Sequence, residues 1–121
     1  MKSVLIVDDS PAFSAMLQKA LMMRGEVKVE LAKNGVEGLD ALKQISPSLI
    51  MLDIEMPIMN GIQFLETIRK SESYKNLPVI IMSANKNTDI IKQAVNLGVS
   101  EYILKPASIQ TILEKVNRVI I

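Results

Sequence analysis

Residues 3–11 of the chain are SVLIVDDSP, a sequence that combines a short apolar run with the start of a helix. An apolar run from Val4 to Val7 has the composition of a buried strand, and it stops at two adjacent aspartates. Ser10 and Pro11 then have the residue types of a helix N-cap and of the first helical position. A short buried strand that leads directly into a helix is the first unit of an alternating β/α fold.

The same alternation continues to the end of the chain. Strands are expected at residues 3–7, 26–32, 49–52, 79–82 and 102–104. Helices are expected over 11–24, from an Asn34 cap to Pro47, from an Asn60 cap onward, from Asn87 or Thr88 to Gly98, and after Pro106. Residues 49–52 and 79–82 are apolar throughout, as in strands covered by helices on both faces. Residues 26–32 alternate polar with apolar, which predicts an edge strand.

Apolar residues recur every three or four positions in each predicted helix and define its core-facing side. These residues are Phe13, Met16, Leu17, Ala20 and Leu21; Val36, Leu39, Leu42 and Ile45; Ile62, Leu65 and Ile68; Ile91, Ala94 and Val95; and Ile109, Ile112, Leu113, Val116 and Ile120. Asn34 with Glu37, and Asn60 with Gln63, are predicted to form capping boxes.

Right-handed crossovers between these strands give a parallel sheet with helices on both faces. With 121 residues, 49% of them apolar and 22% charged, the chain is predicted to form one domain spanning residues 1–121. The expected fold is a flavodoxin-like (βα)5 three-layer sandwich with strand order 2-1-3-4-5, an order taken from that known fold. Most of the eight methionines are expected to fill core gaps. Met22 and Met23 together are candidates for a partner contact, but packing is the preferred interpretation.

Missing residue types exclude several kinds of chemistry. Without histidine there is no Ser-His-Asp triad and no histidine metal ligand, and without cysteine there is no disulfide or thiol nucleophile. A formal net charge of +1 gives no bulk attraction to nucleic acid or to an anionic membrane. Because the sequence has no signal-peptide pattern and no apolar run of ~18 residues, we expect a cytoplasmic protein that binds neither nucleic acid nor membrane.

Polar residues with useful chemistry fall where the predicted strands end. Asp8 and Asp9 follow the first strand, Asp53 the third, Ser83 the fourth and Lys105 the fifth. In an open α/β sheet the ligand crevice forms outside the carboxyl ends of the strands, where the strand order reverses. We therefore expect these five side chains to converge between strands one and three. Each of them alone is also a common turn or surface residue, so the hypothesis depends on their convergence.

Three carboxylates close together raise one another's pKa unless a cation joins them. Mg²⁺ is the expected cation, since it prefers a few oxygen ligands, retained water and a phosphate oxygen. Such an ion would shield the approach of a phosphoryl group to Asp53, whose carboxylate would act as the nucleophile. Lys105 and the Ser83 hydroxyl would then meet the remaining phosphoryl oxygens. The Lys105–Pro106 bond is a candidate for a cis peptide.

Five segments, in order along the chain, resemble one known family. They are Val7–Ser10, Asp53–Gly61, Ser83–Ala84, Gly98–Val99 and Tyr102–Pro106. Together they resemble the receiver domains of two-component response regulators, whose single-domain type is the chemotaxis response regulator. The resemblance covers essentially the whole chain.

The resemblance implies that Asp53 accepts a phosphoryl group, with Mg²⁺, from the phosphohistidine of a sensor histidine kinase or a phosphotransfer protein. It implies that Asp9 binds Mg²⁺ directly, Asp8 mainly through water, and Glu55 through its backbone carbonyl. Glu55 and Asn85 occupy positions that the family uses to tune the lifetime of the phosphorylated state.

Ser83 and Tyr102 resemble the switch pair of that family. Phosphorylation is expected to draw the Ser83 hydroxyl inward and to let Tyr102 turn into the vacated space. This changes the surface formed by the fourth helix, the fifth strand and the fifth helix, a two-state population shift read by an unidentified downstream target. Hydrolysis of the acyl phosphate resets the switch, so the only expected catalysis is self-phosphorylation and self-dephosphorylation.

Three other interpretations stay open from the sequence. A haloacid dehalogenase-type phosphatase also uses an aspartate nucleophile with Mg²⁺, but it needs a second aspartate two residues later, where this chain has Glu55. A flavin-binding module is disfavoured by the presence of only four aromatic residues and by the lack of a hydroxyl-rich phosphate loop. A receiver that only drains phosphate, without an output surface, is the third alternative.

Overall fold

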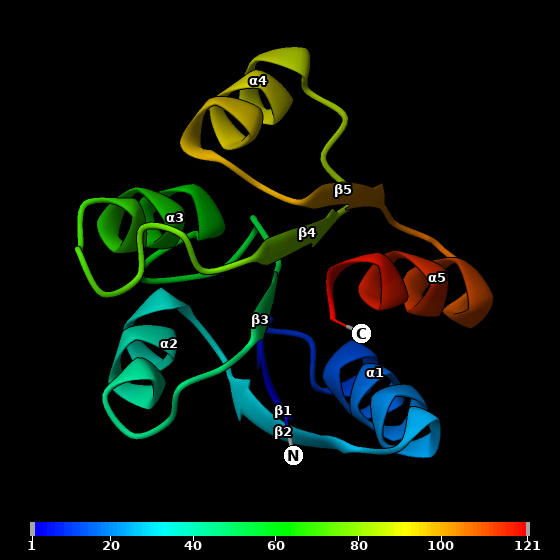
Figure 1. Ribbon diagram of the computed structural model, residues 1–121. Coiled ribbons are helices and arrows are strands. Elements are labelled where there is room, and N and C mark those ends of the chain that lie inside the picture. Colours follow the sequence, from blue (N-terminus) through cyan, green and yellow to red (C-terminus); the bar gives the residue numbers. More distant parts are fainter. Residues whose placement is uncertain (1, 121) are drawn as a thin grey trace.

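The computed structural model describes residues 2–120 and contains five strands and five helices in alternation (Figure 1). In chain order the elements are β1 (Lys2–Val7), α1 (Pro11–Arg24), β2 (Val27–Ala32), α2 (Gly35–Leu42), β3 (Leu49–Leu52), α3 (Gly61–Arg69), β4 (Val79–Ser83), α4 (Thr88–Leu97), β5 (Glu101–Leu104) and α5 (Ile109–Val119). The strands pair in parallel in the order β2-β1-β3-β4-β5. The predicted flavodoxin-like sheet is confirmed, with β2 at one edge.

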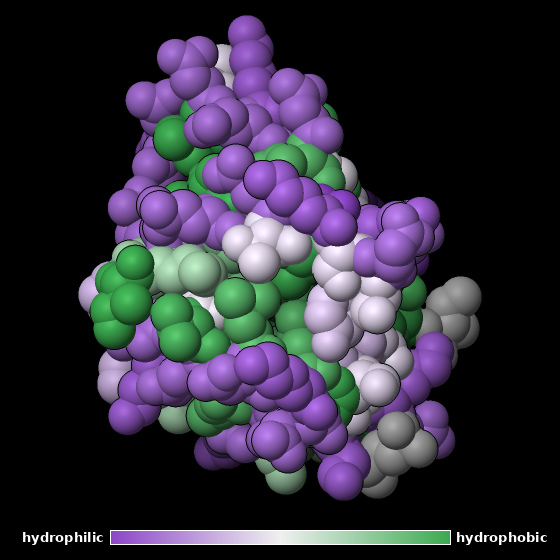
Figure 2. All heavy atoms as spheres, turned by 90° about the vertical axis from the view of Figure 1, so that its left-hand side faces the viewer, coloured by the Kyte–Doolittle hydropathy of each residue, from purple (hydrophilic) through white to green (hydrophobic). Residues whose placement is uncertain are grey.

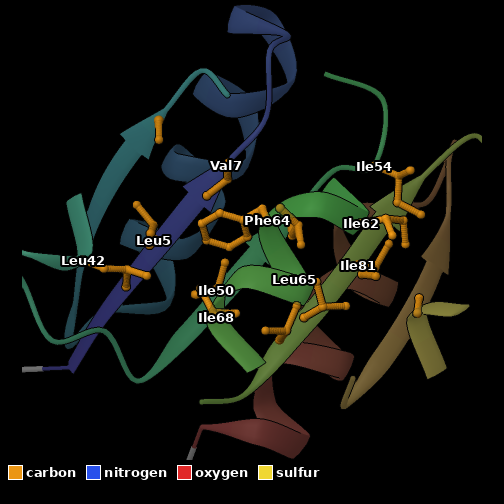
Figure 3. Packing of buried hydrophobic residues seen from close by; sticks show 14 residues of the cluster. Leu5, Val7, Leu42, Ile50, Ile54, Ile62, Phe64, Leu65, Ile68 and Ile81 are labelled. Carbon is orange, nitrogen blue, oxygen red and sulfur yellow. The ribbon is translucent and has the colours of Figure 1, made fainter. Parts of the chain in front are cut away.

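Helices cover both faces of the sheet: α1 and α5 lie on one face, and α2, α3 and α4 lie on the other (Figure 1). Because successive side chains of a strand point to opposite faces, one strand supplies both cores. In β1, Val4 and Ile6 belong to the core under α1 and α5, whereas Leu5 and Val7 belong to the core on the opposite face. Phe64 of α3 is fully buried within this second core (Figure 3).

Helix α2 packs closely on the sheet and on α3 because two of its inward positions are glycines. A Cβ added to Gly38 would lie 2.9 Å from a ring carbon of Phe64, and one added to Gly35 would press into the side chain of Met59. The residues that α2 buries are therefore Gly35, Gly38 and Leu42. The helix also ends at Leu42, earlier than predicted.

Three predicted core-facing positions are wrong. Met16, Val36 and Val95 are 40%, 42% and 57% exposed, respectively. Consecutive residues of a helix point about 100° apart, so only one of two adjacent apolar residues can face the sheet squarely. Gly35 takes that place next to Val36, and Ala94 takes it next to Val95.

Further apolar side chains lie at the surface. Met22 and Met23 of α1 are largely exposed, so the preferred packing interpretation is wrong for this pair. Leu31 on the edge strand β2 is also exposed. Figure 2 shows apolar surface gathered between hydrophilic side chains on the side of the molecule that carries α2 and α3. Within residues 2–120, no helix has both the length and the apolar character needed to cross a membrane.

The predicted caps fix where the helices begin. At α3, Asn60 and Gln63 form a complete capping box, in which each side-chain oxygen accepts the backbone N–H of the other residue. At α2 the box is incomplete, because Asn34 accepts the N–H of Glu37 while the Glu37 carboxylate accepts the N–H of the residue before Asn34. Asn87 is the N-cap of α4.

Candidate functional site

The carboxyl ends of four strands place five polar residues at one edge of the sheet. Asp8 and Asp9 directly follow β1, Asp53 follows β3, Ser83 is the last residue of β4, and Lys105 follows β5. Carboxylate oxygens of the three aspartates all lie within 4.8 Å of one another. Oxygen ligands at this spacing suit a hard divalent cation.

Lys105 reaches the aspartates from the loop between β5 and α5. Its Nζ lies 2.9 Å from Asp8 Oδ2 and 3.9 Å from Asp53 Oδ2. The peptide bond to Pro106 is cis, as expected from the sequence. Asp8 and Asp53 are buried, whereas Asp9 is exposed, so the group has one carboxylate facing solvent and two shielded from it.

Burial changes the acidity of Asp53, the candidate nucleophile, which is only 6% exposed. Because burial penalises the charged carboxylate, the pKa of Asp53 rises from 3.8 to about 6. The Lys105 ammonium opposes this rise, and the Asp8 carboxylate adds to it. The ionised site is therefore destabilised in the folded chain unless a further cation joins it.

Backbone contacts hold Asp53 in place. Its N–H donates to the Val7 carbonyl at 2.9 Å, which continues the pairing of β1 with β3 up to the site. Helix α3 begins directly against this segment, since the Gly61 N–H donates to the Ile54 carbonyl. A Cβ at Gly61 would collide with the Asp53 carbonyl oxygen, so any other residue there would push α3 away.

A second group of side chains lies beside the aspartates. Ser83 is fully buried, and its Oγ accepts the Asn85 N–H at 3.1 Å. The Asn85 side chain donates to Glu55 Oε1 at 2.6 Å, which bridges the loops after β3 and β4. Tyr102 is partly buried, and its hydroxyl donates to the Asn85 carbonyl at 3.0 Å. The structure therefore brings Ser83, Tyr102, Glu55 and Asn85 together around the loop that follows β4.

Burial and neighbouring side chains change the acidity of Tyr102. Burial raises the pKa of Tyr102, and the nearby Ser83 hydroxyl opposes that rise. The neighbouring carboxylates of Asp53 and Glu55 also raise it. Tyr102 is therefore a neutral hydrogen-bond donor next to the site.

Two features of this edge were not predicted from the sequence. The Phe13 ring lies beneath the Lys105 ammonium, whereas helical periodicity identified Phe13 only as a core residue. Ile58, in the loop before α3, has a φ of 69° and is 81% exposed. Isoleucine strongly disfavours this left-handed conformation, so no local signal indicated it.

Comparison with known proteins decides the family. Residues 4–117 match the response regulator receiver domain model. This chain belongs to the response regulator receiver domain family. The receiver domain is 37% identical over 119 residues to the chemotaxis protein CheY of Treponema pallidum, which covers 97% of this chain and 81% of that protein. Three longer curated relatives also match, and the chain spans 14%, 33% and 45% of their lengths.

Solved structures share the fold of this receiver domain. The chemotaxis protein CheY4 of Vibrio cholerae is similar with a TM-score of 0.91 and 28% identity, and 99% of each chain is covered. The response regulator TrrA of Thermotoga maritima, solved in complex with Mg²⁺-BeF, is similar with a TM-score of 0.86 and 29% identity, covering 99% of this chain and 100% of that one. Membership of this family favours a receiver domain of two-component signalling over a haloacid dehalogenase-type phosphatase or a flavin-binding module.

Proposed function

We propose that this receiver domain is a cytoplasmic switch in which Asp53 accepts a phosphoryl group from the phosphohistidine of a sensor histidine kinase or phosphotransfer protein. The observation that carries the proposal is the group formed by Asp8, Asp9 and Asp53, whose carboxylate oxygens lie within 4.8 Å of one another beside the Lys105 ammonium. A buried nucleophilic carboxylate next to a fixed ammonium is suited to receive an anionic group.

The donor set is suited to Mg²⁺. Asp9 and Asp53 would supply carboxylate oxygens and Asp8 would act through a water molecule, since oxygens of the three carboxylates lie within 4.8 Å of one another. The backbone carbonyl of Glu55, two residues after Asp53, would complete the protein ligands. Similarity to the Thermotoga maritima regulator solved with Mg²⁺-BeF supports this assignment. When bound, Mg²⁺ neutralises the excess negative charge and the charge of the incoming phosphoryl oxygens.

Transfer consists of one substitution at phosphorus. A carboxylate oxygen of Asp53 forms a bond to phosphorus while the bond from phosphorus to the donor's imidazole nitrogen breaks, and that nitrogen keeps the electron pair. Lys105, which is 3.9 Å from Asp53 Oδ2, pairs with one phosphoryl oxygen, and the Ser83 hydroxyl donates to another. In the reset step, water attacks phosphorus and the Asp53 carboxylate leaves.

The phosphoryl group is linked to the surface through Ser83 and Tyr102. The Ser83 hydroxyl accepts the Asn85 N–H, and the Tyr102 hydroxyl donates to the Asn85 carbonyl. A shift of Ser83 therefore moves the carbonyl to which Tyr102 is hydrogen bonded. Phosphorylation favours the inward position of Tyr102, which lies on β5 between α4 and α5. The resulting population shift reaches a downstream target that binds the α4-β5-α5 surface.

Glu55 and Asn85 set how quickly the phosphoryl group is lost. Their side chains are hydrogen bonded at 2.6 Å, and Glu55 follows Asp53 by two residues. This bridge restricts the path of an attacking water, so its strength adjusts the lifetime of the phosphorylated state.

Incubation with acetyl phosphate, with and without Mg²⁺, tests the proposal. The wild type should gain the mass of one phosphoryl group only with Mg²⁺, and amide NMR signals around Ser83 and Tyr102 should shift, whereas Asp53→Ala should show neither change. Absence of an acid-labile phosphate in the wild type would contradict the proposal. A mass gain without any shift at Tyr102 would instead indicate a receiver that drains phosphate without an output surface.

A further inference from the structure

Phe13, in the first turn of α1, faces the ammonium group of the site. The Lys105 Nζ lies 4.0 Å from the centroid of the Phe13 ring. Phe13 is also partly buried against the core under α1 and α5, and this packing alone accounts for an apolar residue at the position. Packing does not account for an ammonium centred over the ring, where the negative face of an aromatic ring attracts a cation.

Contacts through the N-cap of α1 connect the ring to the carboxylates. The Ser10 N–H donates to Asp8 Oδ1 at 2.9 Å, and the Phe13 N–H donates to Ser10 Oγ at 3.2 Å. Lys105 Nζ contacts both ends of this chain of hydrogen bonds, since it donates to Asp8 Oδ2 at 2.9 Å and lies over the Phe13 ring. The start of α1 therefore holds the ring and the Asp8 carboxylate on two sides of one ammonium.

The partners of Lys105 differ in what else they bind. Asp8 and Asp53 carry oxygens that also attract a divalent cation or receive the phosphoryl group, so their hold on the ammonium changes when the site is loaded. The Phe13 ring has no net charge and offers no ligand atom to a hard cation. Because the Lys105 side chain is only 20% exposed, its attraction to the ring is less screened than at an open surface.

We infer that Phe13 is a positioning residue for phosphoryl transfer, which holds the Lys105 ammonium beside Asp53 through the face of its ring. The inference rests on the proposed function of Asp53. The ring keeps the ammonium in place while the carboxylates bind a cation or receive the phosphoryl group. The transfer rate should therefore depend on the aromatic face of residue 13. Loss of that face should slow transfer roughly fivefold, within the range of a partly shielded cation–π contact.

The test compares variants of residue 13 in the full chain. The rate of Asp53 phosphorylation by acetyl phosphate with Mg²⁺ is measured for the wild type, Phe13→Leu, Phe13→Tyr and a chain with trifluorinated phenylalanine at position 13. Phe13→Leu keeps an apolar side chain, and fluorination weakens the ring face with little change in shape. Leu113→Ala, which trims another partly buried residue of the same core, controls for loss of packing.

Two further measurements separate positioning from structure. Phe13→Leu is repeated in a Lys105→Gln background, where the ring has no ammonium to hold. The chemical shift of the Lys105 ε-methylene protons reports the position of the ring without any phosphoryl donor, because a ring beneath them moves these signals upfield.

We expect phosphorylation of Phe13→Leu to be roughly fivefold slower than that of the wild type, and the fluorinated chain to have an intermediate rate. Phe13→Tyr and Leu113→Ala should react at nearly the wild-type rate. In the Lys105→Gln background, Phe13→Leu should cause no further slowing. The upfield shift should disappear in Phe13→Leu. If Phe13→Leu is phosphorylated at the wild-type rate, or slows both backgrounds by the same factor, the positioning role is wrong although the proposed function stands. If the wild type gains no phosphoryl group at all, the proposed function and this inference fail together.

Discussion

Two regions of this receiver domain gather charged side chains in opposite ways. At the junction of α3 and α4, the Arg69 guanidinium donates to the backbone carbonyls of Leu97, Gly98 and Tyr74 at 3.1, 2.7 and 3.0 Å. At the carboxyl ends of the strands, three aspartates lie together, and Lys105 pairs with two of them. The first region matches donors to acceptors, whereas the second concentrates charge of one sign.

The difference separates a structural use of charge from a functional one. Arg69 ties the end of α4 and the turn after α3 to one side chain, and its hydrogen bonds compensate for its burial. At the aspartate group, burial raises the pKa of Asp53 to about 6, and the Asp8 carboxylate adds to this rise while Lys105 opposes it, so the ionised site opposes folding. Strongly perturbed carboxylates are typical of functional sites. This one lies at the ligand crevice, where a cation can bind it and an anionic substrate can react with it.

The largest expected effect is on phosphorylation. Asp53→Asn keeps the shape of the side chain but removes the nucleophilic oxygen, so the rate of phosphorylation by acetyl phosphate should fall at least ~10³-fold. Phosphate-affinity gels or mass spectrometry would measure it. Asp40→Asn, which changes an exposed carboxylate, is the matched control and should react at the wild-type rate. Equal rates for Asp53→Asn and the wild type would show that Asp53 is not the residue that accepts the phosphoryl group.

The same substitution should stabilise the protein, and the gain should depend on pH. The folded-state pKa of Asp53 is about 6 against 3.8 for an unperturbed side chain, so the folded chain binds the proton more tightly than the unfolded chain does. The contribution of Asp53 to stability is therefore fully present below pH 3.8 and is lost as the pH rises from 3.8 through about 6, by up to about 3 kcal/mol in all.

Urea unfolding in EDTA measures this effect. Asp53→Asn should be more stable than the wild type by up to about 3 kcal/mol near pH 7, and the two should be nearly equal near pH 4. A difference that does not change with pH would show that the buried charge of Asp53 is not its cause.

At the other region, Arg69→Met should act on stability alone. It leaves the carbonyls of Leu97, Gly98 and Tyr74 without this donor, so the free energy of unfolding should fall by about 2 kcal/mol. Phosphorylation of Asp53 should proceed at the wild-type rate. Lys70→Met removes the exposed neighbouring charge and serves as the control, with little change in either measurement. A large loss of phosphorylation in folded Arg69→Met would show that Arg69 has more than a structural role.

The smallest effect concerns the loop that leads from the site into α3. Ile58 has a φ of 69°, which costs a β-branched residue free energy that asparagine largely avoids. Ile58→Asn should therefore raise the free energy of unfolding by about 1 kcal/mol. Val95→Asn also removes an exposed apolar side chain but lies within α4, and it should give no gain. Equal effects of the two substitutions would show that the backbone of Ile58 is relaxed.

The sequence was sufficient for the alternation of strands and helices and, with the strand order of the known fold, for the grouping of the aspartates with Lys105. Carboxyl ends of parallel strands share one edge, so residues at strand ends can be placed without knowledge of side-chain contacts. The orientation of Val36 and Val95 was not predictable from spacing, since two adjacent apolar residues fit two faces of a helix equally well. In α2, Gly35 and Gly38 determine which side of the helix faces the sheet, because they allow closer packing than any side chain.

Other features depend on partners far away in the chain. Arg69 binds carbonyls up to 29 residues distant, and a backbone carbonyl leaves no mark in the sequence. Phe13 meets Lys105 only because α1 starts beside the end of β5, so its periodicity indicated packing and nothing more. Such contacts become visible only when the elements have been placed in space.

Calorimetric titration with Mg²⁺ tests most directly whether the concentrated charge is a cation site. The expected result is one Mg²⁺ per chain, at least ~10-fold weaker binding by Asp9→Asn, and unchanged affinity in Arg69→Met. Heat no greater than dilution in the wild type, or equal affinity of Asp9→Asn and the wild type, would contradict it.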